Sequence, residues 1–244
     1  MTTELFASSQ TPIARMGDLS KLRPDRLLHS INRALELGFD HEDIAKDARF
    51  QSCIEHLLRE FEVRQGMFAP STQRRLNQSW KIFVCWCEQT NKQPLPASPS
   101  MIEQYLLLRG EQFHRNTLNV DRWAISTVHQ AAGCPDPTRD LIVRQTMRVI
   151  VKKKVRIMNE TVKQAPPFRD SDLDVLTSIW KDSTTLSTLR NLAMMTVAYE
   201  TLLRSQELAN MKLEHIKPLV NGGASVEIPF TKTNQSGDAP NTAA

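Results

Sequence analysis

The chain has 244 residues, of which 40% are hydrophobic and 24% charged, and its formal net charge is +4. That hydrophobic share excludes wholesale disorder, and no run of about 18 apolar residues suggests a membrane-spanning helix. The first twenty residues have no charged start followed by an apolar stretch, so we expect no secretory signal. The four cysteines lack Cys-x-x-Cys spacing, and we expect neither a metal nor another cofactor.

The distribution of charge is more informative than its total. Residues 1–65 carry 9 basic and 11 acidic side chains, residues 66–160 carry 14 and 7, and residues 161–244 carry 8 and 9. The middle segment is therefore strongly basic between nearly neutral flanks. This pattern predicts a polyanionic partner, with nucleic acid slightly favoured over a solvated helical surface rich in lysine and arginine.

The N-terminal third predicts a tail followed by helices. Residues 1–20 show no periodicity, whereas residues 24–38 have an apolar face and end at Gly38, which can stop a helix. Residues 41–65 continue in helical style. Residues 71–90 form the clearest helix, since Leu76, Trp80, Phe83, Val84 and Cys87 fall on one face. We expect Ser71 or Thr72 to cap it.

The basic segment continues as a helical bundle. Ser98 followed by Pro99 is a favoured helix start. Further helices are expected over residues 98–108, 116–133 and 137–156. With the helix at 71–90 they predict one bundle over residues 66–157. Residues 158–168 lack an apolar face and contain two adjacent prolines, which is typical of a linker.

The C-terminal segment changes character near residue 216. Helical stretches are expected at 171–181 and 185–200, and a third helix begins near Arg204. Gly222 and Gly223 then lie between two short strand candidates, which predicts a β-hairpin. Residues 234–244 are expected to be disordered. The fold class is therefore mainly α with a small β-hairpin or sheet.

Three charged side chains in this segment are candidates for chemistry. Arg204 and Glu207 are three residues apart, which places them on one face of a helix, and Lys232 follows the second strand candidate. By spacing alone, an intrahelical ion pair and a solvated lysine explain them. A His-x-x-Arg pair at His56 and Arg59 is interpreted as helix surface.

The stretch AYETLLRSQELANMKLEHI resembles the first arginine motif of the tyrosine recombinases, near their Cre-like branch. TKT in the following hairpin is similar to that family's lysine motif. STQRRLNQSWKIFVCWCEQTNKQPLPASPSMIEQYLL resembles the start of its helical core-binding domain. The resemblance covers about residues 66–237. It implies a helical (SAM-like) DNA-binding domain at 66–157, a linker at 158–168 and the start of an α+β catalytic domain at 169–244, and leaves 1–65 unassigned.

The resemblance also implies a chemistry without metal or nucleotide. A tyrosine attacks the scissile phosphodiester and forms a 3′-phosphotyrosyl link. Arg204 matches the arginine that stabilises phosphate charge, Glu207 its acidic companion, and Lys232 the lysine that protonates the leaving 5′-oxygen. The implied partner is double-stranded DNA, on which the family self-associates, and the implied setting is the bacterial cytoplasm at a nucleoid or plasmid.

The DNA contacts are expected at two places. Thr72, Gln73, Arg74 and Arg75 lie at the start of the first bundle helix and match groove-facing positions of the family. The second place is a basic cluster at the end of the last bundle helix, expected to contact phosphates. It comprises Lys152, Lys153, Lys154 and Arg156.

One departure from the family decides what we expect of this chain. The second arginine motif and the nucleophile should follow Lys232, yet the chain ends twelve residues later, and Tyr105 and Tyr199 both lie before Arg204. We therefore expect a shortened recombinase of plasmid resolution or mobile-element integration that binds DNA without cleaving it. A non-catalytic regulator that occupies recombination sites remains an alternative, as does a helical interaction protein with a fortuitous motif.

Overall fold

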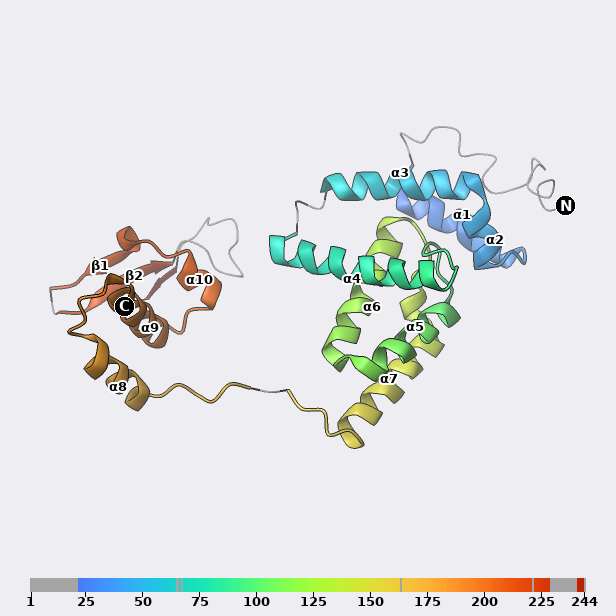
Figure 1. Ribbon diagram of the computed structural model, residues 1–244. Helices are drawn as coiled ribbons and strands as arrows, with labels where there is room; N and C mark the ends of the chain where they lie inside the picture. The colour runs from blue at the N-terminus through green and yellow to red at the C-terminus, as the bar shows by residue number, and fades with distance from the viewer. Residues whose placement is uncertain are drawn as a thin grey trace. The chain divides into compact units, whose positions relative to one another are not determined.

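A computed structural model describes residues 22–64, 66, 68–162, 164–220, 222–228 and 241–243. The chain divides into two compact units, and the division falls between Val162 and Lys163. Ribbons for both units are drawn in Figure 1. The fold is mainly α, as predicted, with a small antiparallel sheet near the C-terminal end.

The first unit contains seven α-helices among its described residues, together with one short 3-10 helix. The α-helices are α1 (Pro24–Glu36), α2 (His41–Lys46), α3 (Ala48–Arg64), α4 (Pro70–Gln89), α5 (Pro99–Gln112), α6 (Arg115–Ala131) and α7 (Leu141–Arg156). The 3-10 helix, η4 (Pro137–Arg139), precedes α7.

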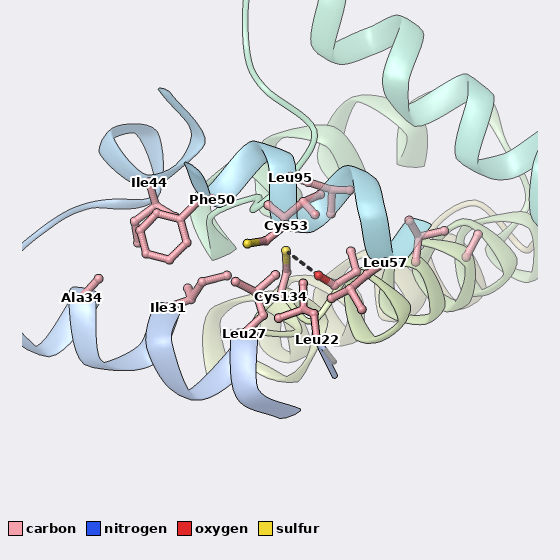
Figure 2. Packing of buried hydrophobic residues seen from close by; sticks show 14 of the residues in the cluster. Leu22, Leu27, Ile31, Ala34, Ile44, Phe50, Cys53, Leu57, Leu95 and Cys134 are labelled. Atoms are coloured by element: carbon pink, nitrogen blue, oxygen red, sulfur yellow. Dashed lines mark hydrogen bonds between the residues drawn. The ribbon is translucent and has the colours of Figure 1, made fainter. Parts of the chain in front are cut away.

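One core joins the N-terminal helices to the bundle. Figure 2 shows Leu27 and Ile31 of α1 facing Cys53 and Leu57 of α3. Leu76 of α4 and residues of α6 belong to the same buried cluster. The helices between residues 22 and 64, which the sequence analysis leaves unassigned, are therefore packed parts of the first unit, because their apolar faces are buried against the bundle.

Gly133, just after α6, makes this close packing possible. Its φ is +68°, a conformation that favours glycine. A Cβ atom there would lie 2.8 Å from the carbonyl oxygen of Pro24 and 3.1 Å from the Cβ of Leu27. Any larger residue would push the start of α1 away from the end of α6.

A second core holds α4, α5, α6 and α7 together. Phe83, Tyr105 and Trp86 pack in an aromatic group whose ring centroids are 5.1 to 6.1 Å apart. Buried polar groups orient the helices around it. Arg109 of α5 donates two hydrogen bonds to Asp121 of α6, at 3.1 and 3.2 Å, and Asp121 is 1% exposed.

Helix starts differ from the sequence-based expectation in three places. Ala69 rather than Ser71 or Thr72 is the N-cap of α4, with Pro70 in the first turn, where its missing N–H costs nothing. His114 caps α6 through its Nδ1, and Asp140 caps α7 after a separate 3-10 turn at residues 137–139. Ser98 caps α5 as predicted, by accepting from the Met101 N–H.

The described part of the second unit combines three α-helices with a sheet. The helices are α8 (Asp170–Trp180), α9 (Leu186–Thr201) and α10 (Ser205–Ala209), followed by a 3-10 turn η5 (Leu213–His215). The strands are β1 (Ile216–Pro218), β2 (Ala224–Ile228) and β3 (Asn241–Ala243). Both strand pairs are antiparallel in the order β1-β2-β3, with Ile216 opposite Val226 and Val226 opposite Ala243.

The hairpin between β1 and β2 confirms the predicted turn around Gly222. The expectation of disorder over residues 234–244 is wrong for 241–243, because these residues pair with β2 and their backbone groups enter the sheet. Helices α8, α9 and α10 contain no fully buried residue, and Val226 is the one buried hydrophobic residue in the described part of this unit. Its helices therefore leave much apolar surface exposed, including Ile179 and Leu186.

Candidate nucleic-acid interface

The first turns of α4 carry the four residues predicted to enter a DNA groove. Arg74 and Arg75 are exposed, whereas Thr72 and Gln73 are partly buried. The Arg74 Nε donates to the carbonyl oxygen of Pro70 at 3.3 Å, which holds the guanidinium over the start of the helix. Thr72 and Gln73 lie in the first turn of α4, where the macrodipole favours a nearby anion.

Helix α7 presents a row of cations that extends beyond the predicted cluster. Arg144, Arg148, Lys152 and Arg156 recur every four residues and are all exposed, so they share one face of the helix. With Asn119 and Arg122 of α6 they line a groove of about 580 Å³, whose other lining residues are Met147, Val151 and Val155. Sequence reasoning missed Arg122, Arg144 and Arg148, although the four-residue spacing along α7 was a readable signal.

None of the five groove cations has an acidic partner within the described residues. The acidic side chains nearest in sequence are already engaged: Asp121 accepts from Arg109 at 3.1 and 3.2 Å, Asp140 accepts from the Ile142 N–H at 2.9 Å, and the Glu160 carboxylate lies 3.3 Å from Lys154 Nζ. Like charges crowded along one groove repel each other, so this surface is electrostatically suited to an anion.

Lys154 differs from its neighbours in the predicted cluster. Its side chain is 4% exposed, and its Nζ lies 3.3 Å from the Glu160 carboxylate. It belongs to the inward face of α7 with Met147 and Ile150, whereas Lys152, Lys153 and Arg156 are exposed. The Lys154 ammonium is thus buried in an ion pair with Glu160, and we leave it out of the proposed phosphate contacts.

The second unit holds the predicted Arg204 and Glu207 together, but not as neighbours within one helix. Leu202 has a φ of +53° and ends α9, so Arg204 is extended and precedes α10. The Arg204 backbone N–H donates to Glu207 Oε2 at 3.0 Å, and its Nη1 donates to Oε1 at 3.0 Å. The Arg204 side chain is nevertheless 63% exposed, so most of its guanidinium faces outward.

The remaining residues are Lys232, which was predicted for the site, and the two tyrosines, which were not. Lys232 lies outside the described residues. Tyr105 is fully buried in the aromatic core, where burial raises the pKa of its hydroxyl. Tyr199 hydrogen-bonds Asp170 through its hydroxyl and packs edge-on against Phe168. Both tyrosines thus have structural contacts. Neither is a hydrogen-bond partner of Arg204 among the described residues.

Among the residues that the structure describes, no helix has the length and apolarity needed to cross a bilayer. No group of three or more histidine, cysteine or acidic side chains there is arranged to hold a metal ion.

Comparison with known proteins identifies two relatives. The recombinase Cre of Escherichia phage P1 is 30% identical over 188 residues, which cover 77% of this chain and 54% of Cre. An integrase/recombinase XerD homolog of Selenomonas ruminantium is 26% identical over 180 residues, which cover 72% of this chain and 51% of that protein. The chain spans about half the length of these curated relatives, and no family model matches it. By these two matches the chain is a relative of the Cre-like recombinases, within the tyrosine recombinase family.

Proposed function

We propose that this chain contributes duplex-DNA binding, and part of a phosphate-activating site, to a site-specific recombinase or integrase. The observation that carries the proposal is the groove between α6 and α7, whose five cations have no acidic partner among the residues that the structure describes. The names of the two relatives, a phage recombinase and a bacterial integrase/recombinase homolog, favour a role in plasmid resolution or mobile-element integration.

The groove suits a phosphate backbone for geometric and energetic reasons. Arg144 to Arg156 spans twelve residues, so the row of cations is roughly 18 Å long at the rise of an α-helix. A duplex carries a regular line of phosphates, and each neutralised phosphate releases counterions. DNA would therefore relieve the mutual repulsion of these side chains, and the apolar floor around Val151 would pack against sugars.

The start of α4 is proposed to supply sequence readout. Arg75 is exposed and has no ion pair within the described residues, so it is free to hold guanine in the bidentate manner of arginine. Gln73 would recognise adenine in the same way. Base readout by α4 and phosphate contacts along α7 are thus assigned to different helices of one unit.

In the second unit we propose that Arg204 binds the scissile phosphate. Glu207 engages the Arg204 backbone and one guanidinium nitrogen, which leaves other N–H donors of that planar group for two phosphate oxygens. A carboxylate beside a phosphate would repel it, so Glu207 is proposed to orient Arg204 rather than to touch DNA. Lys232 is proposed as the proton donor to the leaving 5′-oxygen.

The deciding experiment is a salt titration of the 244-residue chain with a fluorescent duplex of random sequence. Five phosphate contacts predict a slope of about −4.5 in log affinity against log salt concentration. Between about 50 and 200 mM salt the affinity should then fall by several hundredfold. A slope near zero would refute the proposed function. Equal affinity for an acidic polymer that forms no duplex would also refute it.

A further inference from the structure

The chain turns back on α7 directly after the helix ends. The N–H groups of Ile157 and Met158 both donate to the Lys153 carbonyl, at 2.9 and 3.1 Å. Asn159 adopts a φ of +49°, a conformation that asparagine tolerates better than most residues. The Glu160 N–H then donates to the Lys154 carbonyl at 2.9 Å. Glu160 is therefore held against the last turn of α7 by its own backbone.

The Glu160 carboxylate joins this turn to the start of α6. Oε2 lies 3.3 Å from Lys154 Nζ, and Oε1 accepts from the Arg115 backbone N–H at 3.2 Å. His114 Nε2 lies 3.4 Å from the same Oε1, and Arg115 Nη1 donates to the Glu160 carbonyl at 3.4 Å. One acidic side chain thus contacts the first turn of one helix and the last turn of another.

The balance of charge makes this contact necessary. Lys154 is nearly fully buried, and a buried ammonium without a partner is strongly unfavourable. Burial raises the pKa of Glu160, but the Arg115 N–H and Lys154 outweigh burial and leave that pKa below its ordinary value. Glu160 is accordingly ionised at neutral pH and compensates Lys154.

From these contacts we propose that Glu160 is a positioning residue. It fixes the last turn of α7, and with it the exposed cations Lys152, Lys153 and Arg156, together with the point at which the chain leaves the first unit. The consequence for DNA rests on the function proposed above. The structural part, a clamp made by Glu160, Lys154 and the α6 N-terminus, does not.

The structural part is tested by hydrogen–deuterium exchange of the 244-residue chain without DNA. Glu160→Gln removes the charge and keeps the shape, whereas Glu62→Gln is a matched control, because Glu62 is exposed on α3. We expect Glu160→Gln to speed exchange of the amides at 157–162 about tenfold and to leave α4 and α5 unchanged. Equal exchange in wild type, Glu160→Gln and Glu62→Gln would overturn the clamp.

A second variant guards against a general loss of folding. Lys154→Met removes the buried charge and keeps the aliphatic stem. If the ion pair forms the clamp, the double variant Lys154→Met/Glu160→Gln will exchange no faster at 157–162 than the faster single variant. Effects that simply add, or faster exchange throughout α4 and α5, would contradict a local clamp.

The DNA part is tested by the salt titration. Glu160→Gln should make the slope shallower by at least about 0.9, the contribution of one phosphate contact, whereas Glu62→Gln should not. An unchanged slope alongside faster exchange would overturn the positioning role. If the wild-type chain shows no salt-dependent binding, the proposed function fails, and the exchange experiment still decides the clamp.

Discussion

The groove between α6 and α7 makes a quantitative prediction for the double variant Arg144→Gln/Arg148→Gln. Both side chains are exposed, lie one turn apart on α7 and line the groove. Loss of two phosphate contacts should make the slope of log affinity against log salt less steep by about 1.8. Extrapolated from a 1 M reference, the affinity should fall roughly 200-fold at about 50 mM salt and roughly 20-fold at about 200 mM.

The matched control is Arg59→Gln/Arg64→Gln on α3, which changes the net charge by the same amount outside the groove. The measurement is fluorescence anisotropy with a labelled duplex, with urea unfolding beside it. Unfolding should shift by less than about 0.5 kcal/mol per exposed substitution. Equal loss of affinity in the two double variants would show that net charge, rather than this groove, attracts DNA, and an unchanged slope in Arg144→Gln/Arg148→Gln would refute the assignment.

Four further outcomes are expected. Arg75→Ala should relax base preference at one position of a site selected from random DNA, and an unchanged selection would remove α4 from base readout. Asp121→Ala leaves the largely buried Arg109 without its carboxylate partner and should lower the free energy of unfolding, measured in urea, by about 3–5 kcal/mol. A loss under about 1 kcal/mol would be inconsistent with a buried ion pair. Burial lowers the pKa of His129 to about 4. Because the unfolded chain binds that proton near pH 6.5, His129 should make stability fall as pH drops from about 6.5 towards 4, by about 3 kcal/mol, and His129→Gln should flatten this dependence; parallel curves would speak against it. On a nicked duplex, the 244-residue chain should bind yet leave no adduct that survives denaturation, and such an adduct would mean that the tyrosine roles given above are wrong.

The arginine proposed to bind the scissile phosphate shows how far the sequence alone is informative. The order of motifs identified Arg204 and Glu207 as a pair, and the structure brings them within 3.0 Å. The predicted break between a helix at 185–200 and one beginning near Arg204 is present, and the difference is that Arg204 precedes α10 in an extended conformation instead of lying within the helix. Leu202 has a positive φ, which an apolar residue does not signal in sequence, and it separates α9 from α10.

Within the predicted basic cluster, Lys154 differs from Lys152, Lys153 and Arg156 for a related reason. Lys152, Lys153 and Lys154 are indistinguishable as letters, yet the position of each on α7 determines whether it faces solvent or the core. The buried face of α7 runs through Val143, Met147 and Ile150 to Lys154, a helical spacing that the sequence analysis did not apply to this lysine. What periodicity does not reveal is the partner, Glu160, whose carboxylate reaches Lys154 after a turn at Asn159.

By itself, the sequence determined the helices of the first unit, the hairpin around Gly222, the basic character of the middle segment and the family of its motifs. These features follow from local rules: apolar spacing, turn residues and motif order depend on neighbours along the chain. Only the tertiary structure decided that α1 to α3 pack on the bundle and that Arg122 joins the α7 cations in one groove. It also decided that the charge of the buried Lys154 is compensated by the Glu160 carboxylate. Each of these depends on contacts between residues distant in sequence, because burial and ion pairing are set by which helices meet.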